Sequence, residues 1–352
     1  MKKQLLFEAK RILLPLIVFT VIASVLYVLT ALNSNFISVR YDFPGNDYNN
    51  PVEYSVPGNP ITYIPASFLA ILCFIVPVLQ YSYRMKKRSA DLWYALPLTR
   101  TRLMLLRTLG GLALVLLPYT VSYWLGFTAI ALSENLFRLS AYVPLFFASL
   151  GIGILLYGVN SFLYTRANTV GDGIVFMLAW IIVPCLPFLF FLSKNFPFLP
   201  QGSLIESPIL CSSLSPLGWL FSYFDTIIRG TQNTVPYAWF IFGLGAAAGA
   251  AAYFGLFFTA KRHKAENAEQ LSSSAFGYKV LVPYCVALIT AQMDVRYGSF
   301  GMPLVSFAMV LIAGLILFFV YRRSFRLKKS DLISLGGSFA GGLVISLLCV
   351  AI

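Results

Sequence analysis

The residues of this sequence that are best suited to chemistry form a short charged segment between two long apolar runs. The segment, RMKKRSADLWYALPLTRTRL, extends from Arg84 to Leu103, and seven of its twenty residues are charged, against 11% of the whole chain. All but Asp91 of these charges are basic, so the segment can contact lipid phosphates or dock on another protein. It contains no pair of groups suited to acid–base or nucleophilic catalysis.

The rest of the chain also lacks catalytic and metal-binding motifs. There is no HExxH, no GxSxG and no phosphate-binding GxxxxGK[ST] sequence. The single histidine is His263, and the five cysteines form no CxxC pair. We therefore expect no enzyme activity, no catalytic residue, no metal and no cofactor on this chain. If the protein moves something, the energy comes from elsewhere.

The elements that hold the charged segment are expected to be membrane spans. Hydrophobic residues make up 59% of the chain, against roughly 45–50% in soluble domains, and the mean hydropathy is +0.78. A helix of about 20 apolar residues crosses the hydrocarbon core. Such runs occur at 12–32, 61–83, 103–132, 142–164, 173–191, 237–259, 278–293, 301–321 and 332–352. The fold expected is an all-α, polytopic transmembrane bundle of eight to nine spans within one domain, residues 1–352.

The distribution of lysine and arginine predicts the orientation. If the N-terminus is inside, the inner segments hold 21 of the 26 basic residues, as positive-inside bias requires. This places the loops 84–102 and 260–277 in the cytoplasm. The net charge of +13 then follows from inner loops that face anionic lipid and from the positive-inside bias of insertion. We therefore expect no nucleic-acid partner. The first run is longer than the roughly 7–15 apolar residues of a cleaved signal, and we expect it to be retained.

The outer segment 194–236 is expected to contain an amphipathic helix. Ser215 is a suitable N-cap and Pro216 suits the first helical position. One face of this helix collects the apolar residues Leu217, Leu220, Phe221, Phe224, Ile227 and Ile228. The helix either lies on the outer leaflet or plugs against other spans.

Polar and small residues within the runs each have two interpretations. Side chains such as Tyr119 and Asn160 either form hydrogen bonds between helices or line a passage. The small-residue stretches 243–255 and 336–342 either allow close packing within the bundle or form a dimer interface. No acidic residue lies near the middle of a run, which disfavours proton- or sodium-coupled transport.

The charged segment itself predicts a short helix. Ser89 is a good N-cap, Asp91 suits the first turn, and Pro97 disfavours continuation. Thr99 or Thr101 can cap the third run. The apolar side of the short helix carries Leu92, Trp93 and Leu96. A helix of about eight residues is not stable alone in water, so it must dock on the lipid surface, on the ends of the spans or on another protein.

Two motifs resemble the ABC type-2 transporter permeases of Gram-positive bacteria. The first is the order R-S-x-D-x-x-x-x-L-P-x-x-R after the second run, formed here by Arg88, Ser89, Asp91, Leu96, Pro97 and Arg100. The second lies in KRHKAENAEQLSSSAF, where Arg262, Lys264, Glu266 and Ala268 match. In this motif Glu269 stands where glycine is common. The order of the spans and the basic YRRSFRLKK after the eighth run are also similar.

The resemblance implies the permease subunit of an ATP-driven exporter in the bacterial cytoplasmic membrane. In such exporters a coupling helix after the second span docks in a groove of a separate ATPase subunit, which holds ATP and Mg. The groove residues would be Leu92, Trp93 and Leu96, and the polar contacts would come from Arg88, Asp91 and Arg100. Residues 1–11 would form an interfacial helix. A second permease copy or a paralogue would complete the unit.

Two other functions remain open at this point. One is a non-transporting membrane scaffold, sensor or immunity protein that intercepts antimicrobial peptides with its outer segment. The other is a secondary transporter. An exporter requires an ATPase partner, whereas a scaffold, sensor or immunity protein would still work when that partner is inactivated. For an exporter, the aromatic-rich spans favour an amphipathic cargo such as a peptide, a drug or a lipid.

Overall fold

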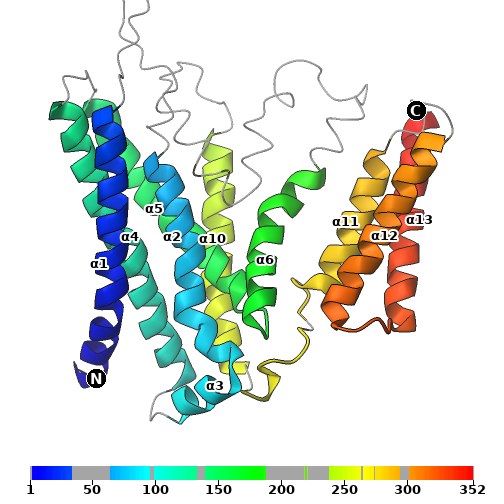
Figure 1. The fold of residues 1–352 in the computed structure, drawn as a ribbon, viewed down its shortest axis with the longest axis horizontal. Helices are drawn as coiled ribbons and strands as arrows, with labels where there is room; N and C mark the ends of the chain where they lie inside the picture. Colours follow the sequence, from blue (N-terminus) through cyan, green and yellow to red (C-terminus); the bar gives the residue numbers. More distant parts are fainter. Residues whose placement is uncertain are drawn as a thin grey trace, which may run out of the picture. The chain divides into compact units, whose positions relative to one another are not determined.

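The computed structural model describes residues 2–33, 64–95, 99–132, 139–187, 218, 220, 238–262, 265–272, 274–293 and 301–351, and most of these residues are helical. No strand occurs in these ranges, so the expected all-α class is confirmed. The helices, with η marking the 3-10 type, are α1 (Lys2–Asn33), α2 (Ile64–Tyr81), η2 (Ser82–Met85), α3 (Lys87–Tyr94), α4 (Arg100–Leu132), α5 (Leu139–Tyr164), α6 (Val170–Ile182), η3 (Val183–Cys185), α10 (Ala238–Arg262), η4 (Ala265–Asn267), α11 (Tyr278–Gln292), α12 (Gly301–Arg322) and α13 (Lys329–Ala351) (Figure 1).

Six of the described helices are long and apolar enough to cross a membrane. They are α1, α2, α4, α5, α12 and α13. Two further runs of the sequence form shorter apolar helices, α6 with 13 residues and α11 with 15, and another lies in α10. These helices indicate a membrane-embedded protein, and a count of eight to nine spans stays a prediction. The outer segment 194–236 lies outside the described residues except for Gly218 and Leu220, which are helical.

The helices divide into two compact units. Unit 1 consists of Met1–Gln80, Pro97–Ser161 and Pro216–Arg262 and contains α1, α2, α4, α10 and most of α5. Unit 2 consists of Tyr81–Leu96, Phe162–Ser215 and His263–Ile352. It contains the expected short helix α3 together with η2, α6, η4, α11, α12 and α13.

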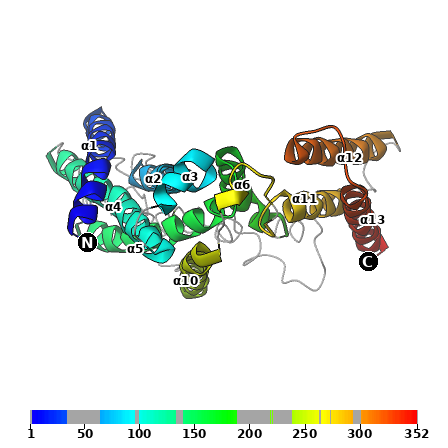
Figure 2. The ribbon, with the colours of Figure 1, turned by 90° about the horizontal axis from the view of Figure 1, so that it is seen from below.

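In unit 1 the first helix packs along α4, and the two lie side by side in both views (Figures 1 and 2). The approach is close because Gly126 of α4 leaves room for an aromatic ring, and a Cβ at this position would overlap the ring of Tyr27. The Tyr27 hydroxyl in turn forms a hydrogen bond of 2.8 Å with the Tyr142 hydroxyl of α5. Aromatic packing and a buried hydrogen bond therefore join three helices at this level.

The N-terminal residues form one continuous helix with the first span instead of a separate element. Within α1, Glu8 is 7% exposed, and its carboxylate lies 3.0 Å from Arg11 Nη2 and 3.4 Å from Nε of Arg107 in α4. Arg11 also donates to Gln80 of α2 at 2.5 Å. A buried carboxylate is tolerated only when it is paired. The contacts of Glu8 with Arg107 and of Arg11 with Gln80 connect α1 to α4 and to α2. Whether residues 1–11 lie at a membrane interface stays a prediction.

Polar side chains within unit 1 form hydrogen bonds between helices. Tyr119 of α4 donates to Ser149 of α5 at 2.7 Å, and Asn160 of α5 donates to the backbone oxygen of Cys73 in α2 at 3.0 Å. The small residue Gly249 of α10 lies directly against Leu155 of α5. For these residues the packing interpretation is confirmed.

In unit 2 the last three helices form a group in which α11 and α13 lie side by side (Figures 1 and 2). Close packing depends on Gly342 of α13, since a Cβ there would meet the backbone oxygen of Ala287 at 2.5 Å. The turn between α12 and α13 is held by a bidentate pair, in which Nε and Nη2 of Arg322 each lie 2.7 Å from a carboxylate oxygen of Asp331. Fork-shaped pairs of this kind fix geometry as well as supplying energy.

Candidate functional site

The short helix α3 is held on unit 2 by one of its faces. Ala90 is fully buried, and the ring of Trp93 packs against the ring of Tyr83 in η2 with 5.8 Å between centroids. Residues three apart lie on the same side of a helix, so Ala90 and Trp93 together form the face that contacts the rest of the chain. Trp93 therefore anchors α3 from within the protein.

The opposite face of α3 is exposed. It presents Arg88, Asp91 and Leu92, which are three and four residues apart and so share one side of the helix. Leu92 is 69% exposed. Neither Arg88 nor Asp91 forms an ion pair with another residue that the structure describes. The face offers one cation, one anion and one large apolar side chain to a partner.

The start of α3 differs from the expectation from the sequence. The helix begins at Lys87, two residues before Ser89, so Ser89 lies inside it and is not its N-cap. The residue at the N-cap position, Lys86, provides no side-chain hydrogen bond. Instead, Oε1 of Glu269 accepts a hydrogen bond of 3.3 Å from the Lys87 backbone nitrogen. A carboxylate at this end is favourable because the first amides of a helix lack partners within the helix.

Glu269 adopts a backbone conformation that favours glycine. Its φ is 65°, in the left-handed region where a side chain costs about 1–2 kcal/mol. Its backbone nitrogen donates to the oxygen of Asn168 at 2.9 Å, which fixes the turn. The conformation gives a physical reason why glycine suits this position. The glutamate present here adds the contact with α3 that glycine cannot make.

The parts of the two sequence motifs that belong to unit 2 therefore lie next to each other, which their separation in the sequence does not predict. Beyond the bond from Glu269 to Lys87, η4 contacts α3, and Glu266 in η4 is exposed beside it. Two other residues of the second motif are less fully described. Arg262 is the last residue of α10, but the structure does not describe its side chain, and Lys264 lies outside the described residues.

The remaining residues of the first motif are only partly described. Leu96 and Pro97 lie outside the described residues. Arg100 is exposed and begins α4, which belongs to unit 1. The expected cap of this helix is confirmed for Thr99, whose Oγ1 accepts from the backbone nitrogen of Arg102 at 3.4 Å.

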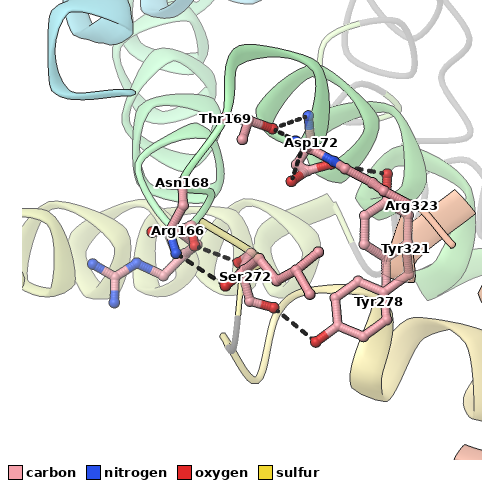
Figure 3. A network of polar contacts seen from close by, with 9 residues as sticks. Arg166, Asn168, Thr169, Asp172, Ser272, Tyr278, Tyr321 and Arg323 are labelled. Carbon is pink, nitrogen blue, oxygen red and sulfur yellow. Dashed lines mark hydrogen bonds and ion pairs between the residues drawn. The ribbon is translucent and has the colours of Figure 1, made fainter. Parts of the chain in front are cut away.

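The loop that carries Glu269 rests on a network of polar contacts, drawn in Figure 3. Asn168 Nδ2 donates to the backbone oxygen of Leu271 at 3.2 Å, and the hydroxyl of Ser272 donates to the backbone oxygen of Arg166 at 3.1 Å. Tyr321, near the end of α12, donates its hydroxyl proton to the backbone oxygen of Ser272 at 3.1 Å. The loops before α6 and before α11 are thereby held together with α12.

A second part of the same network joins the start of α6 to the end of α12 (Figure 3). Thr169 caps α6 by accepting from the Asp172 backbone nitrogen at 3.3 Å. Nη2 of Arg323 lies 3.0 Å from Thr169 Oγ1 and 3.4 Å from Asp172 Oδ2. The sequence patterns did not predict these contacts, because they join residues more than 150 positions apart.

The chemistry available at α3 is that of a binding surface. Within the described ranges no group of three or more histidine, cysteine, aspartate or glutamate side chains is placed to hold a metal ion. Comparisons with protein-family models, curated proteins and solved structures find no match. The fold and the site together define a membrane-embedded helical protein with a short, internally braced helix that exposes one mixed face.

Proposed function

We propose that this chain is the membrane-spanning permease subunit of an ATP-binding-cassette exporter, and that α3 is the helix on which the ATPase subunit docks. The single observation that carries the proposal is the division of α3 into two faces. Ala90 and Trp93 fix the helix to its own chain, while Arg88, Asp91 and Leu92 remain exposed. A helix that transmits force between subunits needs both a firm base and a free face.

The base of α3 supports the same proposal. Glu269 joins α3 to the loop before α11, and that loop is bonded to the loop before α6 and to Tyr321 of α12. A displacement of α3 would therefore be passed to three segments of unit 2 through direct contacts. Movement of packed elements between two arrangements is a common way to couple sites.

The proposed assembly contains two permeases, identical or paralogous, and two ATPases that hold ATP and Mg. Its location is the bacterial cytoplasmic membrane, with α3 and the N-terminus on the inner side and eight to nine spans. The expected cargo is an amphipathic peptide, drug or lipid. The face of α3 suits a protein groove, since it combines an apolar side chain with charges of both signs.

The test is purification of the tagged full chain in mild detergent, with mass spectrometry of the proteins that remain bound. The proposal expects an ATPase bearing a GxxxxGK[ST] loop at about one copy per chain. Leu92→Glu and Arg88→Glu should each remove it, because both disrupt the exposed face. Arg326→Glu is the matched control, since Arg326 is also exposed but lies outside α3.

Two results would reject the proposal. One is the absence of an ATPase under conditions that preserve other membrane complexes. The other is an ATPase that binds Leu92→Glu as well as the unaltered chain. Either result would favour a scaffold, sensor or immunity protein, whose activity should persist when the ATPase is inactivated.

A further inference from the structure

Two arginines in unit 2 have buried side-chain nitrogens and no acidic partner among the residues that the structure describes. Arg84 of η2 is 3% exposed, and both its Nη1 and Nη2 atoms are buried with no hydrogen-bond partner. Arg166, in the loop between α5 and α6, is half-buried, and its Nε also has no hydrogen-bond partner. Among the residues that the structure describes, no carboxylate forms an ion pair with either arginine.

The two arginines belong to neighbouring segments. Met85 follows Arg84, and Tyr164 lies two residues before Arg166. A Cβ at Gly173 would meet the ring of Tyr164 at 2.6 Å and Cε of Met85 at 3.3 Å, so these two side chains converge on one glycine. The Tyr164 hydroxyl is itself buried and has no hydrogen-bond partner. Arg84, Tyr164 and Arg166, which lie on these neighbouring segments of unit 2, thus each carry a buried donor atom without a hydrogen-bond partner among the described residues.

The charge of Arg84 acts on Arg166. Burial, together with the nearby charge of Arg84, lowers the pKa of Arg166 to about 10. The Arg166 guanidinium also lies over the ring of Phe162, 5.0 Å from its centroid, which offsets part of the cost of burial. At neutral pH the guanidinium of Arg166 nevertheless remains protonated, because a pKa of about 10 lies well above 7.

A buried guanidinium without an anion is strongly unfavourable. The buried, unpaired nitrogens of Arg84 therefore call for an anion that is not among the residues the structure describes. A guanidinium presents a planar fork of donors that matches phosphate oxygens in a bidentate manner. Arg84 is also the last residue but one of the candidate span Ile64–Met85, and lipid headgroups lie at the level where a span ends.

We propose that Arg84 and Arg166 form a binding site for a phosphate group, supplied by an anionic lipid headgroup or by free phosphate. The site is separate from the exposed face of α3 and does not depend on the exporter proposal. An occupied site would brace η2, and Tyr83 of η2 supports α3 through Trp93.

The experiment measures thermal unfolding of the delipidated full chain in detergent, with added phosphatidylglycerol or inorganic phosphate. Arg84→Met removes the charge and keeps most of the side-chain volume. Without an added anion, this variant should unfold at the same temperature as the unaltered chain or at a higher one, because an unpaired buried charge is lost. Added phosphatidylglycerol should raise the unfolding temperature of the unaltered chain. Arg84→Met should bind phosphatidylglycerol at least about tenfold more weakly.

Controls make the result specific. Arg326→Met removes an exposed arginine and should respond to the ligand like the unaltered chain. Arg166→Gln alters a half-buried member of the site and should also weaken binding, which keeps the proposal testable if Arg84→Met does not fold. A response to phosphatidylglycerol alone identifies a lipid headgroup, and a response to both ligands shows that phosphate alone is sufficient.

Three outcomes would overturn the proposal. The first is no stabilisation of the unaltered chain by either ligand. The second is equal stabilisation of the unaltered chain and Arg84→Met. The third is a loss of stability in Arg84→Met before any ligand is added, which would show that the chain itself supplies the partner of Arg84.

Discussion

The carboxylate of Glu269 accepts a hydrogen bond from the backbone nitrogen of Lys87 across 182 positions of sequence, at 3.3 Å. The bond joins the loop before α11 to the first residue of α3. Glu269 makes it from a left-handed conformation with a φ of 65°. A residue in an unfavourable backbone conformation thus caps the short helix that carries the candidate docking face.

Removing this cap should loosen the start of α3. Glu269→Ala should destabilise the first turn by about 1 kcal/mol, which corresponds to roughly fivefold faster hydrogen exchange at residues 87–89. Glu269→Gln keeps an acceptor oxygen and should give a smaller change. Glu269→Gly also loses the cap but relieves the backbone strain, so it should be globally more stable than Glu269→Ala by about 1 kcal/mol. Equal hydrogen-exchange rates at residues 87–89 in Glu269→Ala and in the unaltered chain would show that the hydrogen bond does not stabilise the start of α3.

Altering Trp93 should lower the stability of the protein, whereas altering its neighbour Leu92 should not. Trp93→Ala removes the ring that packs on Tyr83 and should lower the thermal unfolding temperature, since losing a large aromatic contact costs about 3 kcal/mol or more. Leu92→Ala truncates a side chain that is 69% exposed, and it should leave stability within about 0.5 kcal/mol. Thermal unfolding of both variants in the same detergent measures the difference. A larger loss for Leu92→Ala would contradict the assignment of the two faces.

The buried charge cluster of unit 1 should be sensitive to loss of its carboxylate. Glu8→Ala leaves Arg107, which is 1% exposed, without the carboxylate that lies 3.4 Å from its Nε. Breaking a buried pair in this way costs about 3–5 kcal/mol. Lys10→Ala, at an exposed position of the same helix, is the control and should be nearly neutral. Thermal unfolding of the purified chain measures both variants, and a similar small effect for both would exclude a structural role for the pair.

Two glycines of unit 1 provide a matched test of helix packing. Gly126→Ala places a methyl group into the ring of Tyr27 and should destabilise the contact between α1 and α4 by about 1–3 kcal/mol. Gly151→Ala adds the same group where no atom lies within 4 Å. It should stabilise α5 slightly, because alanine favours helix more than glycine does. Unfolding temperatures that fall equally in both variants would mean that α1 and α4 do not pack as described.

The sequence alone was sufficient to determine the helical fold class and the presence of α3. Both depend on local features: runs of apolar residues long enough to cross a membrane, and a short polar segment closed by turn and cap residues. The cap at Thr99 was also predictable, because its partner, Arg102, lies three residues away. The roles of Arg88, Asp91 and Leu92 as contact residues stay predictions. The structure shows that these three share an exposed face, whereas Trp93, expected beside Leu92, lies on the other face.

Only the tertiary structure decided where α3 begins and which of its faces is free. A capping rule based on neighbouring residues selects Ser89, whereas the acceptor that caps the helix is Glu269, from a distant loop. Burial likewise depends on what surrounds a side chain, so the sequence does not separate Trp93, which is an internal anchor, from Leu92, which is exposed. For the same reason the sequence does not separate Arg84, which is buried, and Arg166, which is half-buried, from the many exposed basic residues of the chain. Local patterns determine the elements, and contacts between distant segments determine which side chains remain available for a partner.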